Sequence, residues 1–169
     1  MKWSYFPRQC WALSGVMVGM VLLFAIAASA QAPSIEGTYQ LLSRKLPDGT
    51  MLHPPDVMGL WTYTKSHYNF NIVRKDATGK FSSFSMVSTY KLTATEYSET
   101  RLFSVLTDQI SGKDIVYDLS GKTQSAPVKI EGGRIEFKHP FEPPALVFEG
   151  NKITATAEGS FVDVWEKVP

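Results

Sequence analysis

The stretch from Gly59 to Val73 constrains the fold most, because apolar and polar side chains alternate on both sides of Lys65-Ser66. Alternation with a period of two is typical of β-strands, whose successive side chains point to opposite faces. A turn at Lys65-Ser66 pairs Thr64 with His67. That register collects four rings on one face of the hairpin, namely Trp61, Tyr63, Tyr68 and Phe70.

Two further hairpins are predicted from glycine-containing turns. Gly132-Gly133 is a strong turn signal because both residues tolerate positive φ. The resulting register sets opposite charges across the outer face and puts apolar residues on the other, namely Val128, Ile130, Ile135 and Phe137. A turn at Gly150-Asn151 likewise pairs Phe148 with Ile153.

A fourth hairpin, about Ala94-Thr95, brings charge onto a ring-bearing face. If this pair is the turn, Glu99 and Arg101 share a face with three rings, namely Tyr90, Tyr97 and Phe103. Burying both charges is costly unless they are paired with each other or with a ligand. The alternative is a register that is slipped by one residue, which would leave both charged side chains in water.

The whole pattern predicts an all-β protein, an antiparallel barrel or sandwich with little helix. Strand signals recur at short intervals, and the last strand is expected from Phe161 to Val168. The clusters of proline and glycine at 46–49, 53–56 and 139–144 are typical of loops. The best helical candidate is a short turn near Leu106–Ile110.

The first thirty residues have the features of a cleavable export signal. Lys2 and Arg8 precede an uncharged apolar run from Trp11 to Ala27, which is followed by Ala28-Ser29-Ala30. The alternative is an uncleaved anchor, since the run approaches the roughly 20 residues that cross a bilayer. Cleavage predicts an N-terminus at Gln31, no stable membrane anchor, and a periplasmic or extracellular protein.

Residues 31–169 read as one domain, since no linker or charge run divides them. The first thirty residues hold two of the 17 basic residues and none of the 16 acidic ones, so the remainder has a net charge of −1. No nucleic-acid partner is implied. The single cysteine, Cys10, lies in the signal, so neither a disulfide nor thiol chemistry is expected in the domain. Oligomeric state is not indicated.

No catalytic motif and no cofactor site is found in the sequence. The serines lack a Gly-X-Ser-X-Gly elbow, and there is no cysteine–histidine pairing. His53, His67 and His139 are scattered, so we expect exposed loop histidines rather than metal ligands. A metal site would need loops to join His53 and His139 with Asp56 or Glu142.

The sequence resembles the bacterial lipocalin-like domain proteins over residues 31–169. The residues that carry the resemblance are Ile35–Ser43, Asp48-Gly49-Thr50, the Pro54-Pro55 pair, Gly59–Thr64, Glu158-Gly159-Ser160 and Trp165–Val168. The Gly-X-Trp of lipocalins is Gly37-Thr38-Tyr39 here. The resemblance implies an up-and-down β-barrel of about eight strands starting at Gly37, with an apolar cavity. Members of the wider group bind small apolar molecules, but no ligand-specific residue carries over.

Three functions are compatible with these observations. The first is a soluble carrier that binds a small apolar ligand, acidic if Arg101 is the anchor, within a wall of Trp61, Tyr63, Tyr68, Phe70, Tyr90, Tyr97 and Phe103. In this reading Arg101 or Glu99 is the polar anchor. The second is an isomerase or cyclase with Glu99 as general acid or base. The third is an envelope protein that binds other proteins through its loops, in which the rings fill the barrel completely.

Overall fold

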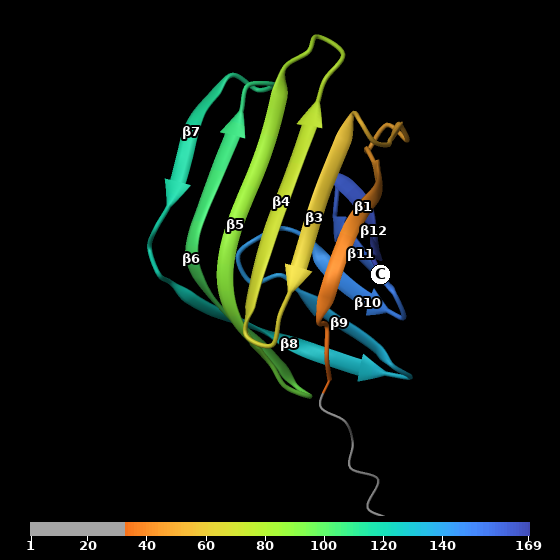
Figure 1. The fold of residues 1–169 in the computed structure, drawn as a ribbon, viewed down its shortest axis with the longest axis vertical. Helices are drawn as coiled ribbons and strands as arrows, with labels where there is room; N and C mark the ends of the chain where they lie inside the picture. Colours follow the sequence, from red (N-terminus) through yellow and green to blue (C-terminus); the bar gives the residue numbers. More distant parts are fainter. Residues whose placement is uncertain (1–32) are drawn as a thin grey trace, which may run out of the picture. The chain divides into compact units, whose positions relative to one another are not determined.

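Residues 33–169, which the computed structural model describes, form twelve antiparallel strands and no helix (Figure 1). The predicted export signal at 1–30 lies outside these residues. Within 33–169, no helix has the length and apolarity of a membrane-crossing segment. The strands are β1 (Gly37–Lys45), β2 (Met51–Leu52), β3 (Val57–Tyr63), β4 (His67–Lys75), β5 (Phe81–Leu92), β6 (Glu96–Asp108), β7 (Lys113–Asp118), β8 (Thr123–Glu131), β9 (Arg134–Lys138), β10 (Ala145–Glu149), β11 (Lys152–Ala157) and β12 (Phe161–Lys167).

Ten strands close into a barrel, because β12 pairs with β1 at the end of the order β12-β11-β10-β9-β8-β6-β5-β4-β3-β1. Strands β2 and β7 pair with β1 and β6 outside this ring. The expectation of about eight strands, which followed the family resemblance, is therefore wrong. The four predicted hairpins contain eight strands. The first strand, which starts at Gly37, and the last strand bring the number to ten. Barrel diameter grows with strand number, so ten strands enclose a wider interior than eight.

The predicted hairpin registers are confirmed. Trp61 lies opposite Phe70, and Tyr63 opposite Tyr68. The Ala94-Thr95 turn is also present, with Tyr90 opposite Glu99, so the slipped register is excluded. The glycine turns likewise give the expected pairs, such as Val128 with Phe137 and Phe148 with Ile153. The helical turn expected near Leu106–Ile110 is wrong, because Leu106 pairs with Val116 in the β6–β7 hairpin.

Two bulges change which residues face inward. In β6 the register shifts between Arg101 and Phe103, which are paired with Ser88 and Val87. One extra residue reverses the alternation beyond it. Inward positions are odd up to Arg101, but the next buried residue is Ser104. The prediction that Phe103 shares the face of Tyr97 is therefore wrong, and Phe103 lies on the outer surface.

The equivalent bulge in β1 lies between Leu41 and Ser43, which are paired with Trp165 and Val164. Tyr39 and Leu41 point inward before it, and Arg44 does so after it, opposite Asp163. Without the bulge, Arg44 would fall on the outer face with Gln40 and Leu42.

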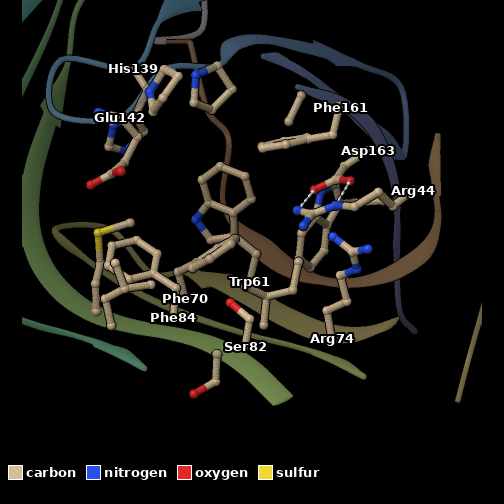
Figure 2. Close-up of a pocket in the computed structure, with 18 residues that line it drawn as sticks. Arg44, Trp61, Phe70, Arg74, Ser82, Phe84, His139, Glu142, Phe161 and Asp163 are labelled. Carbon is tan, nitrogen blue, oxygen red and sulfur yellow. Dashed lines mark hydrogen bonds and ion pairs between the residues drawn. The ribbon is translucent and has the colours of Figure 1, made fainter. Parts of the chain in front are cut away.

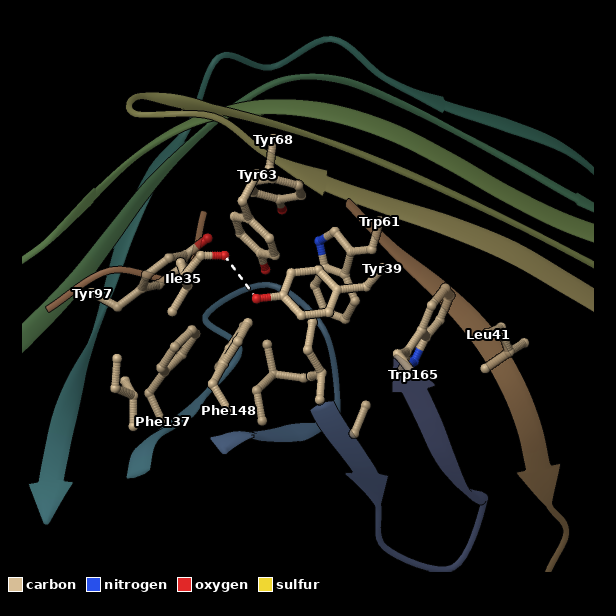
Figure 3. Close-up of a cluster of buried hydrophobic side chains, with 14 of the residues drawn as sticks. Ile35, Tyr39, Leu41, Trp61, Tyr63, Tyr68, Tyr97, Phe137, Phe148 and Trp165 are labelled. Carbon is tan, nitrogen blue, oxygen red and sulfur yellow. Dashed lines mark hydrogen bonds between the residues drawn. The ribbon is translucent and has the colours of Figure 1, made fainter. Parts of the chain in front are cut away.

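Aromatic rings fill one region of the interior (Figure 3). Tyr97 stacks between Tyr90 and Phe137 with ring centroids 5.8 and 4.3 Å apart, and Phe137 stacks in turn on Phe148. Tyr63 packs edge-on against both Tyr90 and Phe148. This part of the barrel is a packed core.

Gly59 provides the space for the indole of Trp165. A Cβ at position 59 would lie 2.7 Å from the Trp165 ring and 2.8 Å from the carbonyl oxygen of Asn71. Position 59 points inward between Val57 and Trp61, so the absence of a side chain lets Trp165 of β12 lie against β3. The two tryptophan rings consequently meet, with their centroids 5.7 Å apart.

Candidate functional site

A pocket of about 280 Å³ lies beside the aromatic core (Figure 2). It is bounded by inward side chains of seven strands, β1, β3, β4, β5, β6, β11 and β12, and by the loop between β9 and β10. Most of its surface is apolar. The apolar lining consists of Trp61, Phe70, Ile72, Phe84, Met86, Leu106, Pro143, Pro144, Ala155, Phe161 and Trp165.

The two tryptophans form the central wall. Trp61 contacts Phe70 edge-on at 4.9 Å between centroids, and Phe70 lies 5.5 Å from Trp165. The indole Nε1 atoms of Trp61 and Trp165 are both buried without a hydrogen-bond partner in the described structure. A buried donor without a partner costs free energy. Both rings therefore offer apolar surface and an unused donor beside the pocket.

Charged side chains stand on one side of these rings. Arg44 donates two hydrogen bonds of 2.6 Å to the carboxylate of Asp163, and its guanidinium lies over the Phe161 ring. Burial raises the pKa of Asp163, although Arg44 opposes this shift. Figure 2 shows Arg74 beside this pair.

Arg74 differs from Arg44 in having no counter-charge. Its Nε is buried without a partner, and no hydrogen bond or ion pair of its guanidinium is found within residues 33–169. Two guanidinium groups and one carboxylate leave one uncompensated positive charge at the edge of a ring-lined pocket. This combination suits a ligand with an apolar body and an anionic group.

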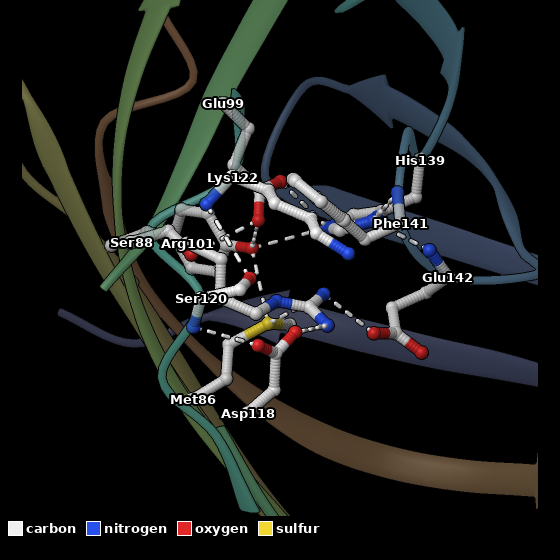
Figure 4. A network of polar contacts seen from close by, with 11 residues as sticks. Met86, Ser88, Glu99, Arg101, Asp118, Ser120, Lys122, His139, Phe141 and Glu142 are labelled. Carbon is white, nitrogen blue, oxygen red and sulfur yellow. Dashed lines mark hydrogen bonds and ion pairs between the residues drawn. The ribbon is translucent and has the colours of Figure 1, made fainter. Parts of the chain in front are cut away.

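A separate polar network lies behind His139 and Met86, which border the pocket (Figure 4). The Glu99 carboxylate accepts hydrogen bonds from Tyr68 at 2.6 Å and from Ser88 at 2.9 Å. Its other oxygen lies 3.2 Å from His139 Nε2. Burial raises the pKa of Glu99, opposed by these hydroxyl donors and by the charge of Arg101.

His139 is neutral in this network. Its Nδ1 accepts from the backbone N–H groups of Phe141 and Glu142, so its proton is assigned to Nε2, which faces Glu99. Burial lowers the pKa of His139 to about 3. The expectation of exposed histidines holds for His53 and His67 but is wrong for His139, which is 2% exposed. Both of its nitrogens are occupied, so it offers none to the pocket.

Arg101 is buried and fully engaged. It donates a 2.6 Å hydrogen bond to Glu142, lies 3.7 Å from Asp118, and stacks over the Phe141 ring. Of the two alternatives left by the sequence, the buried one is found, with Glu99 1% and Arg101 6% exposed. Neither residue lines the pocket, however, and each is paired with protein groups.

The ring residues predicted as a ligand wall divide into three groups. Trp61 and Phe70 line the pocket. Tyr63, Tyr68, Tyr90 and Tyr97 pack within the core instead. Phe103 is on the outside, because of the β6 bulge. The interior is thus filled at the tyrosines and hollow at the tryptophans.

Sequence reasoning missed the charged side of the pocket. Arg74 could have been found, because Tyr68, Phe70, Ile72 and Arg74 continue one alternating series along β4. Arg44 could not, because its inward direction depends on the β1 bulge. Within residues 33–169, no group of three His, Cys, Asp or Glu side chains is placed to hold a metal ion.

Comparison of the chain with protein-family models, with curated proteins and with solved structures found no match.

Proposed function

We propose that this protein is an exported carrier that binds one small apolar ligand with an anionic group in the pocket beside Trp61 and Trp165. Export is supported by the sequence of residues 1–30 alone. The observation that carries the ligand proposal is Arg74, an arginine that has no counter-charge among residues 33–169 and lies at the edge of a ring-lined pocket. A lipocalin-like ancestry remains part of the proposal, supported by the closed antiparallel barrel.

The size of the pocket limits the ligand. A cavity of about 150 Å³ in another protein takes up benzene, so 280 Å³ accommodates about ten to twelve non-hydrogen atoms. The volume is near the lower end of the range for small-molecule sites, roughly 300–1,000 Å³. Medium-chain carboxylates such as decanoate and small aromatic acids are of suitable size.

Arg74 replaces Arg101 as the proposed anchor. Arg101 is held by Glu142 and Asp118 and does not line the pocket, whereas Arg74 lines the pocket and its Nε has no partner among residues 33–169. In this arrangement the ligand carboxylate lies against Arg74, and its apolar part packs on Trp61 and Phe70. Glu99 lies behind His139 and does not line the pocket, so the acid or base of the enzyme alternative would not contact a ligand bound there.

Tryptophan signals provide a direct test of binding. We expect decanoate to shift the ¹⁵N–H indole resonances of Trp61 and Trp165, because both indoles border the pocket with unpaired N–H groups. In the form that starts at Gln31 these are the two tryptophans of the chain, because Trp3 and Trp11 lie in the export signal. If neither decanoate nor small aromatic acids shift the two signals, the carrier proposal fails.

The anchor is tested with Arg74→Met, which removes the charge but keeps much of the apolar stem. Loss of a charge-assisted hydrogen bond costs about 1.5–3 kcal/mol, and partial exposure of Arg74 favours the lower figure, so decanoate affinity should fall about tenfold. Arg134→Met is the matched control, because Arg134 is exposed and paired with Glu136 outside the pocket. Calorimetry with decanoate and with decanol, which carries a neutral hydroxyl on a chain of the same length, measures how much the anionic group contributes to binding. Equal binding of both compounds by the wild type would refute an anionic ligand.

A further inference from the structure

One wall of the pocket is a loop rather than a strand. His139, Glu142, Pro143 and Pro144 line the pocket from the segment between β9 and β10, and Pro143 is also exposed to solvent. The pocket wall is therefore a single layer of chain at Pro143. All other lining residues belong to strands whose backbone is held by ladder hydrogen bonds. Loop 139–144 is the part of the wall that can move without breaking a ladder.

The hydrogen bonds made by the backbone of this loop are few and mostly long. Pro140, Pro143 and Pro144 have no N–H to donate. One hydrogen bond, from the N–H of His139 to the carbonyl of Pro144, closes the base of the loop at 2.9 Å. The N–H groups of Phe141 and Glu142 reach His139 Nδ1 only at 3.4 and 3.2 Å, at or beyond the long end of the usual range.

The tip of the loop is held by one side chain from β6. Arg101 donates to Glu142 at 2.6 Å and places its guanidinium 4.4 Å from the centre of the Phe141 ring (Figure 4). Arg101 itself is 6% exposed, whereas the Glu142 side chain is 26% exposed. Water can therefore reach the Glu142 carboxylate and compete for the contact, while Arg101 stays in place.

Opening would not leave Arg101 without a counter-charge. Asp118 of β7 lies 3.7 Å from the other terminal nitrogen of Arg101, and its carboxylate remains there when Glu142 departs. A buried charge that loses its only partner costs several kcal/mol, but a charge with a second partner does not bear that full cost. Arg101 therefore has suitable partners in both a closed and an open state.

We propose that loop 139–144 is a gate over the pocket, latched by the Arg101–Glu142 ion pair, and that it opens about its His139–Pro144 base to admit and release the ligand. Ligand passage rests on the proposed carrier function, but the latch itself does not. In the open state Phe141 and Glu142 leave Arg101. The His139 ring stays against Glu99.

The latch is tested without a ligand by hydrogen exchange of the Phe141 and Glu142 amides. Glu142→Gln keeps the shape of the side chain but removes its charge, so these amides should exchange at least tenfold faster than in the wild type. Glu136→Gln is the matched control, since it breaks the exposed Arg134–Glu136 pair on neighbouring β9. Unchanged exchange in Glu142→Gln, with the protein folded by circular dichroism, would overturn the latch. Glu142→Ala, which also removes the hydrogen bond, should exchange faster still.

The gate is tested by stopped-flow kinetics with decanoate. The association and dissociation rate constants should both rise by a similar factor in Glu142→Gln, with the dissociation constant changed less than either rate. If decanoate binds with wild-type rates in this variant, the gate is wrong although the carrier stands. If decanoate does not bind at all while exchange is accelerated, the carrier proposal fails and the latch remains.

Discussion

At the scale of single residues, two neighbouring tyrosines in the core differ in one respect. The hydroxyl of Tyr68 donates to the buried Glu99 carboxylate, whereas the hydroxyl of Tyr63 is buried with no partner in the described part of the chain. The two rings pack together, with centroids 5.2 Å apart. Burial raises the pKa of both hydroxyls well above the ordinary value, so both remain protonated.

This difference predicts opposite effects of removing the two hydroxyls. Tyr68→Phe takes a donor from a buried carboxylate and should lower the free energy of unfolding by about 1–3 kcal/mol. Tyr63→Phe removes only an unpaired polar group and should leave stability unchanged or slightly raised. Urea denaturation of the two variants measures the contrast. A cost in Tyr63→Phe equal to that in Tyr68→Phe would contradict the hydrogen-bond assignment.

The alternation about Ala94-Thr95 predicted that Glu99 and Arg101 share a ring-bearing face, although a register slipped by one residue would have left both in water. Their partners could not be predicted. His139 and Glu142 come from a loop about forty residues further along, and their contacts depend on how that loop folds over the barrel.

At the scale of strands and hairpins, the registers were predictable wherever a two-residue turn fixed them. Gly132-Gly133 and Lys65-Ser66 determine every pair in their hairpins, since a slip by one residue would expose a whole apolar face. The bulges at Leu41/Ser43 and near Leu102 leave no comparable signal, because any residue can be the extra one. They determine where Arg44 and Phe103 point.

Strand β3 provides a test of packing between distant strands. Gly59→Ala places a Cβ 2.7 Å from the Trp165 ring and 2.8 Å from backbone, so the indole must shift. Overpacking of this kind costs about 1–3 kcal/mol, and the displaced indole should also weaken decanoate binding. Leu60→Ala on the same strand is the control, because Leu60 points outward and is 50% exposed. Thermal denaturation and calorimetry check both effects; wild-type stability in Gly59→Ala would contradict the close packing.

At the scale of the whole molecule, stability should depend on acidity through His139. The folded protein holds the pKa of His139 near 3, below the ordinary 6.5. Between these values the unfolded chain binds a proton that the folded chain does not, so acidification favours unfolding. The raised pKa values of Glu99, Glu142 and Asp163 act in the opposite direction, because stability from them is lost as the pH rises.

Comparison with His139→Asn isolates the histidine contribution. The Asn oxygen can accept from the loop amides as Nδ1 does, but the side chain does not titrate. The difference in free energy of unfolding between the wild type and His139→Asn should shift against the wild type by up to about 1.4 kcal/mol per pH unit as the pH falls below 6.5. Urea denaturation from pH 7 to pH 4 measures both proteins. Parallel curves would show that His139 is not held neutral.

The all-β class and the four hairpins followed from local signals, but strands β2 and β7 and the pocket did not. Its lining combines residues from seven strands and a loop, and their distances depend on ring closure. The expected number of about eight strands came from the family resemblance and is wrong, since ten strands form the barrel.

Closure of the barrel determines when during folding the ligand pocket is formed. The seam between β1 and β12 joins residues that are far apart in the sequence, 119 positions in the Arg44–Asp163 pair, and such non-local pairing makes folding slow. Trp165 and Asp163, both on β12, are walls of the pocket. A chain in which β1 and β12 have not yet paired therefore lacks the binding site. Only molecules with a closed barrel can bind the proposed ligand.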